Sequence, residues 1–201
     1  MPSQETNGTG KIRPANRIPS RVGQFVKCTR LLVTVVCCFA VIGAARADVT
    51  REYLIKAAFL YNFAKFVDWP GEVFTGADEP FVFCIAGDAA LEAANEALAG
   101  KTIKDRQIRV VRFSATTQSR HCHILFLSTE NGRNLFDRVR LNVEHPTLTV
   151  SDRREIAESG VIVNLMTVEN KIRFDVNNAA ARRAGLQISA RLLKLARSVS
   201  N

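Results

Sequence analysis

The most regular pattern of apolar positions begins at Tyr53 and stops at Pro70. Apolar residues fill nearly every position between them, which predicts a helix over 51–67 that is buried, or covered by a partner, on almost every side. Pro70 and Gly71 end the pattern because proline cannot continue a helix. The aromatic side chains of this run are more typical of a core than of a ligand site.

The rest of the chain alternates strand patterns with helix patterns. Short runs rich in β-forming residues predict strands, and apolar positions at helical spacing predict helices. The expected strands are 81–86, 108–113, 123–127, 147–150, 161–166 and 171–176; the expected helices are 89–99, 131–141, a short one that begins at Asn177 or Asn178 and reaches Gly185, and a last one that begins at Ser189 and carries a stripe of Leu192, Leu195, Ala196 and Val199.

Strands interleaved with helices predict an α/β fold. We expect a single-domain three-layer sandwich, in which a mixed, mostly parallel sheet of about five to six strands has helices on both faces. The last two strands are joined by four residues, 167–170, which are typical of a hairpin turn. Residues 48–201 are enough for one domain with a full core, and they contain no repeat and no linker.

Residues 1–47 have the three parts of a secretory signal peptide. Basic residues come first, 31–42 is an apolar stretch, and Ala45-Arg46-Ala47 is a small-x-small cleavage signal. A membrane span needs about 20 apolar residues, more than this stretch has. We therefore expect cleavage near Ala47-Asp48, a periplasmic location, and no stable membrane insertion afterwards. An uncleaved N-terminal anchor is the alternative.

The net charge changes meaning once this segment is set aside. The whole chain has a formal net charge of +9, and residues 1–47 hold seven of its 28 basic and one of its 19 acidic residues. Residues 48–201 keep 21 basic and 18 acidic residues, a balance of +3. Nucleic-acid binding needs a clustered basic face, so we expect no nucleic acid as a partner.

Two cysteines remain after the signal segment, Cys84 and Cys122. An even pair in an exported protein favours a structural disulfide, because the compartment is oxidising. A redox-active or metal-binding thiol is the alternative.

Motifs for catalysis and metal binding are weak. The segment 99–102 (AGKT) resembles the end of a phosphate-binding loop, but Asn95 stands where that loop needs glycine. The run 121–123 (HCH) is the one metal-like cluster, and His145 has no evident partner. A catalytic zinc site needs three protein ligands, so we interpret 121–123 as a solvated loop that enters a strand.

Charged residues elsewhere have simple interpretations. Asp152 and Glu155 flank two arginines in an expected solvated turn. The C-terminal arginines either bind an acidic ligand or partner, or form the solvated face of terminal helices; they are Arg182, Arg183, Arg191 and Arg197. We expect no catalytic residue, no cofactor and no metal, and thus a protein that is not an enzyme.

Two segments together are similar to a known family. Residues 57–70 (AAFLYNFAKFVDWP) resemble the N-terminal signature of the YfiR family, and 160–196 resemble its C-terminal end. The resemblance covers nearly all of 50–198. It implies a small periplasmic α/β protein in which Cys84 and Cys122 match a family disulfide. Some members have a second disulfide later in the chain, for which this sequence has no cysteine after Cys122.

The best-known members of that family bind the periplasmic sensor domain of an inner-membrane diguanylate cyclase. They repress the enzyme, which lowers cyclic di-GMP and biofilm formation. An outer-membrane lipoprotein can sequester the repressor, and members can form homodimers. The resemblance implies the same function and partners for this chain.

We predict a partner-binding surface that includes Ile172 and Phe174 as exposed apolar residues, together with Arg182 and Arg183. A second hypothesis is a periplasmic small-molecule-binding sensor subunit for a membrane histidine kinase or cyclase. Its ligand would occupy a pocket between the sheet and the first helix.

Overall fold

The structure, a computed structural model, describes residues 49–76, 78–114, 122–128, 145–153 and 160–201. The expected helix 131–141 and the expected signal segment 1–47 lie outside these residues. The strands are β1 (Val67–Asp68), β2 (Phe81–Ala86), β3 (Thr102–Ile103), β4 (Arg106–Arg112), β5 (Ile124–Leu127), β6 (Leu148–Ser151), β7 (Val163–Val168), β8 (Lys171–Asn177), β9 (Gln187–Ile188) and β10 (Ser198–Ser200). The helices are a long one over 49–66, the short η1 (Gly71–Val73), α2 (Asp88–Leu98), α4 (Asn178–Arg183) and α5 (Ala190–Leu195).

The central sheet has eight strands in the order β10-β8-β7-β6-β5-β2-β4-β3. Only the β3–β4 and β7–β8 pairs are antiparallel, and the other pairs are parallel. The predicted mixed, mostly parallel α/β sheet is therefore confirmed. The sheet has more strands than predicted because two short strands, β3 and β10, extend its two edges. A separate two-stranded ladder joins β1 to β9.

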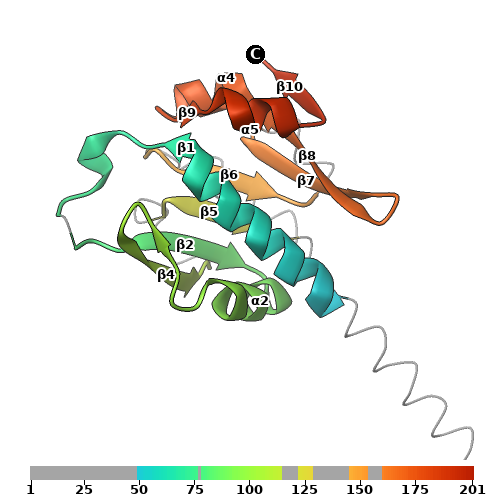
Figure 1. Cartoon of the computed structure of the whole chain (residues 1–201), viewed down its shortest axis with the longest axis horizontal. Coiled ribbons are helices and arrows are strands. Elements are labelled where there is room, and N and C mark those ends of the chain that lie inside the picture. The colour runs from blue at the N-terminus through green and yellow to red at the C-terminus, as the bar shows by residue number, and fades with distance from the viewer. Residues whose placement is uncertain (1–48, 77, 115–121, 129–144, 154–159) are drawn as a thin grey trace, which may run out of the picture. The chain divides into compact units, whose positions relative to one another are not determined.

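One face of this sheet forms the main core. Because side chains alternate along a strand, residues two apart share a face; Phe81, Phe83 and Ile85 of β2 lie on the same side as Ile124 and Phe126 of β5. The helix 49–66, α2, α4 and α5 contribute buried residues to this same cluster. In Figure 1 the long helix lies in front of the sheet, with α2 and α5 on either side of it. A smaller apolar cluster lies on the other face of the sheet. It contains Cys84, Leu125 and Leu127, which alternate along β2 and β5 with the residues of the main core.

The helix 49–66 is amphipathic, so the prediction that the chain itself buries it nearly all round is wrong, and cover by a partner stays a prediction. Its buried residues recur at helical spacing, from Tyr53 through Leu60 to Ala64. Ile55 is 44% exposed and Ala58 is exposed, so one stripe of the helix faces solvent. No helix in the described part of the chain is both long and apolar enough to cross a membrane.

The last helix is shorter than the sequence predicts. The prediction of one apolar stripe that reaches Val199 is wrong, because α5 ends at Leu195 and the backbone is extended at Ala196 (φ −67°, ψ 146°). Ser198–Ser200 then pairs in parallel with β8. Leu192 is buried, whereas Leu195 is 66% and Val199 37% exposed. The chain therefore presents two apolar side chains to solvent, Leu195 at the end of α5 and Val199 in the edge strand β10.

Candidate functional site

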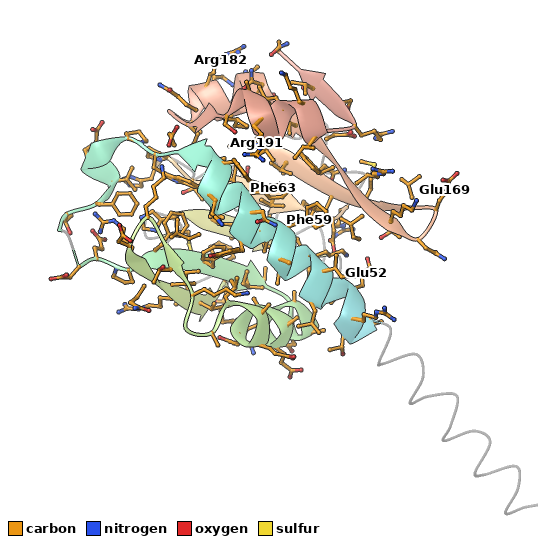
Figure 2. The ribbon with its side chains drawn as sticks, in the orientation of Figure 1. Glu52, Phe59, Phe63, Glu169, Arg182 and Arg191 are labelled. Atoms are coloured by element: carbon orange, nitrogen blue, oxygen red, sulfur yellow. A yellow bond between two sulfur atoms is a disulfide. The ribbon has the colours of Figure 1, made fainter. Side chains whose placement is uncertain are left out.

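Phe174, predicted as an exposed contact residue, is instead part of the core. It is only 5% exposed and makes edge-to-face contacts with Phe63 and Phe59, at ring-centroid distances of 5.1 and 6.1 Å. Figure 2 shows Phe59 and Phe63 between the long helix and the β7–β8 hairpin. The period-2 pattern of β8 explains this position, because Phe174 and Val176 share the face that packs against the helix. Phe174 therefore holds the helix on the sheet and cannot contact a partner directly.

Other residues near the C-terminus are accessible. We define the C-terminal surface as Ile172, which is half-buried, and the exposed Arg182, Arg183, Leu195 and Val199. Arg182 projects from α4 at the top of the view in Figure 2.

The segment between α5 and β10 is fixed on the sheet. The backbone N–H of Arg197 donates to the carbonyl oxygen of Phe174 at 2.8 Å. The guanidinium of Arg197 also pairs with both carboxylate oxygens of Asp175. Burial raises the pKa of Asp175, but the hydrogen bonds and charge of Arg197 outweigh it, so the net pKa is lowered. Leu195 and Val199 are therefore presented by a fixed segment.

The two remaining cysteines form a disulfide. Cys84 on β2 and Cys122 just before β5 have Cα atoms 5.6 Å apart, and 38 positions separate them in the sequence. Both are buried, at 1% and 4% exposure. The bond covalently links β2 to the segment that leads into the neighbouring parallel strand β5.

A buried ion pair joins the long helix to the sheet. Lys56 Nζ lies 2.6 Å from Asp152 Oδ2 and 2.7 Å from Glu52 Oε1. The Lys56 and Asp152 side chains are 6% and 2% exposed, so the prediction that Asp152 lies in a solvated turn is wrong. Burial alone would lower the pKa of Lys56, but the charge and hydrogen bonds of the two carboxylates raise it. Lys56 therefore stays cationic at neutral pH and is not available as a nucleophile.

His123 is also buried, at 3% exposure, which contradicts its interpretation as part of a solvated loop. Its ring stacks on those of Phe74 and Phe81, with centroid distances of 4.6 and 4.7 Å and interplanar angles of 12° and 26°, and the two phenylalanine rings are themselves 6.3 Å apart. Its Nδ1 accepts a hydrogen bond from the Val82 backbone N–H at 2.9 Å. Burial lowers the pKa of His123 to about 4. Two charges have smaller effects: Glu79 raises this pKa and Arg106 lowers it. The ring is therefore neutral at physiological pH.

A pocket of about 270 Å³ opens beside His123, at the amino ends of β5 and β6. It is lined by Glu72, Val73, Thr75, Glu79, Cys122, His123, His145 and Pro146. The fold thus brings His145, which has no evident partner in the sequence, to the same pocket as His123. His121 lies outside the described residues, so the predicted 121–123 cluster is described only in part. Nowhere in the described ranges do three His, Cys, Asp or Glu residues lie close enough to hold a metal ion.

Sequence reasoning missed both the buried ion pair and this pocket. Lys56, which falls among the buried positions of the long helix, was a signal for a buried cation, but nothing local identifies Asp152 as its partner. The pocket joins residues from three separate segments, and no spacing in the sequence relates Glu72 to His145.

Comparison with known proteins identifies a matching protein family. A protein-family model described as DUF4154, YfiR/HmsC-like, matches residues 53–197. No curated protein matches the chain. The crystal structure of a conserved domain protein from Vibrio cholerae O1 biovar eltor strain N16961 is 16% identical with a TM-score of 0.43, over 60% of this chain and 55% of that one. The chain thus spans little more than half of that protein, and a likeness at this level carries no argument.

Proposed function

Because this chain belongs to the YfiR/HmsC-like family, whose model spans residues 53–197, we propose that it is a periplasmic regulatory protein of cyclic di-GMP signalling. In this proposal it binds the periplasmic sensor domain of an inner-membrane diguanylate cyclase and represses that enzyme. The family match is the observation that carries the proposal. Residues 1–47 act as a cleaved signal peptide, and 48–201 form the exported domain. An outer-membrane lipoprotein that sequesters the chain, and a homodimer, are further parts of the same proposal.

The chemistry of the described residues is compatible with a binding protein. The buried Lys56 is held cationic between two carboxylates, and the buried His123 is neutral and stacked against Phe74 and Phe81. Both groups are fixed by packing rather than presented to a substrate. A repressor needs a surface whose affinity differs between two states of its partner, and it needs no acid–base pair.

We assign the partner contact to the C-terminal surface. Leu195 at the end of α5 and Val199 in the edge strand β10 are exposed apolar side chains, and β10 has no neighbour on its outer side among the described strands. Apolar residues on a fixed segment are suited to become the centre of an interface. Arg182 and Arg183 on α4 supply positive charge nearby, and charge of this kind chiefly affects association rate and orientation.

Cyclic di-GMP concentration in living cells tests the function. Deletion of the gene is expected to raise cyclic di-GMP, and the full chain supplied in trans is expected to restore it. A version that begins at residue 48 stays in the cytoplasm and is the matched control, because it has the same domain without export. If both versions restore the level, periplasmic action is wrong. If deletion leaves cyclic di-GMP unchanged while purification of the cross-linked chain yields a histidine kinase, the sensor-subunit hypothesis is favoured.

A further inference from the structure

The long helix has one stripe of residues that is exposed to solvent. Its members are three or four positions apart, so they lie one above another on a single face of the helix; they are Ile55, Ala58, Asn62 and Lys65. We call these four residues the helix stripe. In Figure 2 the helix that carries them lies at the front of the molecule, with Glu52 near one end and Arg191 beside the other.

The half of the helix stripe nearer the amino end is apolar. Ile55 and Ala58 are exposed, and the half-buried Leu54 and Phe59 flank them. The Phe59 ring packs inward on Phe174, so it forms a fixed border of this half. Ala58 has only a methyl group, which leaves room for another helix to come close. This half of the stripe is therefore suited to helix packing.

The other half of the helix stripe is basic. Lys65 Nζ and Lys101 Nζ each lie 5.2 Å from the centre of the Tyr61 ring, and the Arg191 guanidinium lies 5.6 Å from that of Phe66. Contacts of this kind with a ring hold a cation in place. The three cations are exposed, and among the residues that the structure describes none of them forms an ion pair with a carboxylate. Their charges are therefore available to a partner.

We propose that the helix stripe binds an amphipathic helix of another protein, which carries carboxylates in its first turn and apolar residues in the turns that follow. The carboxylates pair with Lys65, Lys101 and Arg191, and the apolar residues pack on Ile55 and Ala58. Carboxylates are favourable at the amino end of a helix, so the bound helix runs antiparallel to the long helix. The stripe is separate from the C-terminal surface, so the proposal does not depend on repression of a cyclase.

The order of charge along the helix stripe argues against a second copy of the chain as the occupant. In a two-fold contact the same patch meets itself. An antiparallel pairing would place Lys65 over Ile55, and a parallel pairing would place cations opposite cations. Neither arrangement is complementary, so the occupant must carry a different sequence.

A membrane surface is also a poorer fit than a protein helix. A helix that lies in a membrane interface carries basic residues along its polar face and large apolar side chains along the other. Here the cations gather at one end, and the exposed apolar residues of the stripe are one isoleucine and one alanine.

Site-specific cross-linking in the cells that make the protein tests the proposal. A photoreactive benzophenone side chain replaces Asn62 in the middle of the helix stripe, and the same group at Asn95, which is exposed on α2, is the matched control. Mass spectrometry of the cross-linked peptide identifies the bound segment. At Asn62 we expect a segment of another protein in which clustered carboxylates precede apolar residues at helical spacing, and at Asn95 no such product.

Charge reversal tests the basic half. Lys65→Glu with Lys101→Glu is expected to lower the cross-link yield at Asn62 about tenfold, because opposite charges across the interface become like charges. Lys171→Glu with Arg173→Glu makes the same change of charge at exposed positions of β8 and is expected to leave the yield unchanged. Circular dichroism checks that both variants fold. The proposal is overturned if Asn62 gives no product, if the product is a lipid or a second copy of this chain, if the bound segment lacks carboxylates, or if the first variant gives the wild-type yield.

Discussion

Lys56 and Asp152 are 96 positions apart in the chain, and their side chains form an ion pair of 2.6 Å in the protein interior. Lys56 comes from the long helix, and Asp152 follows directly after β6. The ammonium group also lies 4.7 Å from the centre of the Tyr53 ring, one turn earlier on the helix. The pair therefore fixes the helix against the carboxyl end of a central strand, where apolar packing alone would leave its position along the sheet less defined.

Replacement of Lys56 by methionine is expected to destabilise the protein by about 3–5 kcal/mol, because the Asp152 carboxylate then loses its cation in a buried position. Chemical denaturation measures the loss. Lys65→Met is the matched control, since Lys65 is exposed on the same helix and its loss is expected to cost less than about 1 kcal/mol. The double change Lys56→Met with Asp152→Asn is expected to recover part of the stability. A loss below about 1 kcal/mol for Lys56→Met would show that the pair contributes little.

The long helix and the six principal strands follow from local pattern, which is why they could be predicted. Apolar spacing and a terminal proline are properties of neighbouring residues, and each strand stands out as a run of β-forming residues. The short strands β3 and β10 carry no such pattern, because two or three residues gain their hydrogen bonds only from a strand that is already in place. The same limit applies to the Lys56–Asp152 pair, since only the folded sheet brings the two residues together.

Phe174 shows a different kind of error. Its position was predictable from the strand itself, because Phe174 and Val176 alternate with Arg173 and Asp175 and must share a buried face. The assignment of Phe174 to a contact surface came from family resemblance, which carries no information on side-chain direction. His123 could not be placed in this way, because the rings that cover it come from two segments about 40 to 50 positions earlier.

The stability of the protein is expected to fall between about pH 7 and about pH 5 because of His123. Its pKa is lowered from 6.5 to about 4 by burial, so in this window the unfolded chain binds a proton that the folded chain does not. The linkage relation gives a loss of about 2 kcal/mol over that range. Glu79 and Arg106 are the charged groups that act on the ring, with opposite effects.

Denaturation at several pH values measures this dependence, and an NMR titration of the ring gives the pKa directly. His123→Phe keeps an aromatic ring against Phe74 and Phe81, and it is expected to flatten the slope between about pH 5 and about pH 6.5. The pKa values of the carboxylates of Glu52, Glu79 and Asp175 are lowered, so in the folded protein these groups titrate below this window. A measured pKa of about 6 or higher for His123 would contradict the prediction.

Removal of the disulfide is expected to destabilise the protein by about 3–4 kcal/mol. The bond closes a loop of 38 positions, and its loss increases the conformational entropy of the unfolded chain. The change is Cys84→Ala with Cys122→Ala, measured by denaturation without reductant. Wild-type protein unfolded in the presence of dithiothreitol is the control and should match the variant. Because both cysteines are buried, reductant is expected to act on the folded wild type only slowly. Equal stability of variant and oxidised wild type would contradict the prediction.

Phe174→Ala is expected to cost about 3–5 kcal/mol of stability, because it removes the ring that packs against Phe59 and Phe63. Denaturation at neutral pH measures this loss. Leu195→Ala is the control near the same end of the molecule. It is 66% exposed, so its loss is expected to change stability by no more than about 0.5 kcal/mol. If Phe174→Ala folds with wild-type stability, the ring does not hold the helix on the sheet.

Leu195→Glu is expected to weaken partner binding at least about tenfold while the protein keeps its stability. Leu195 is the most exposed large apolar side chain of the described residues, and a charge there places an unpaired carboxylate in the proposed interface. Ile55→Glu is the matched control, because Ile55 is 44% exposed on the solvent stripe of the long helix and the substitution is the same. Calorimetry with the purified periplasmic domain of the partner cyclase measures both affinities, and denaturation confirms that both variants fold. If Ile55→Glu abolishes binding while Leu195→Glu binds as the wild type does, the contact lies on the long helix rather than on the C-terminal surface. The proposed repression would then stand with a different interface.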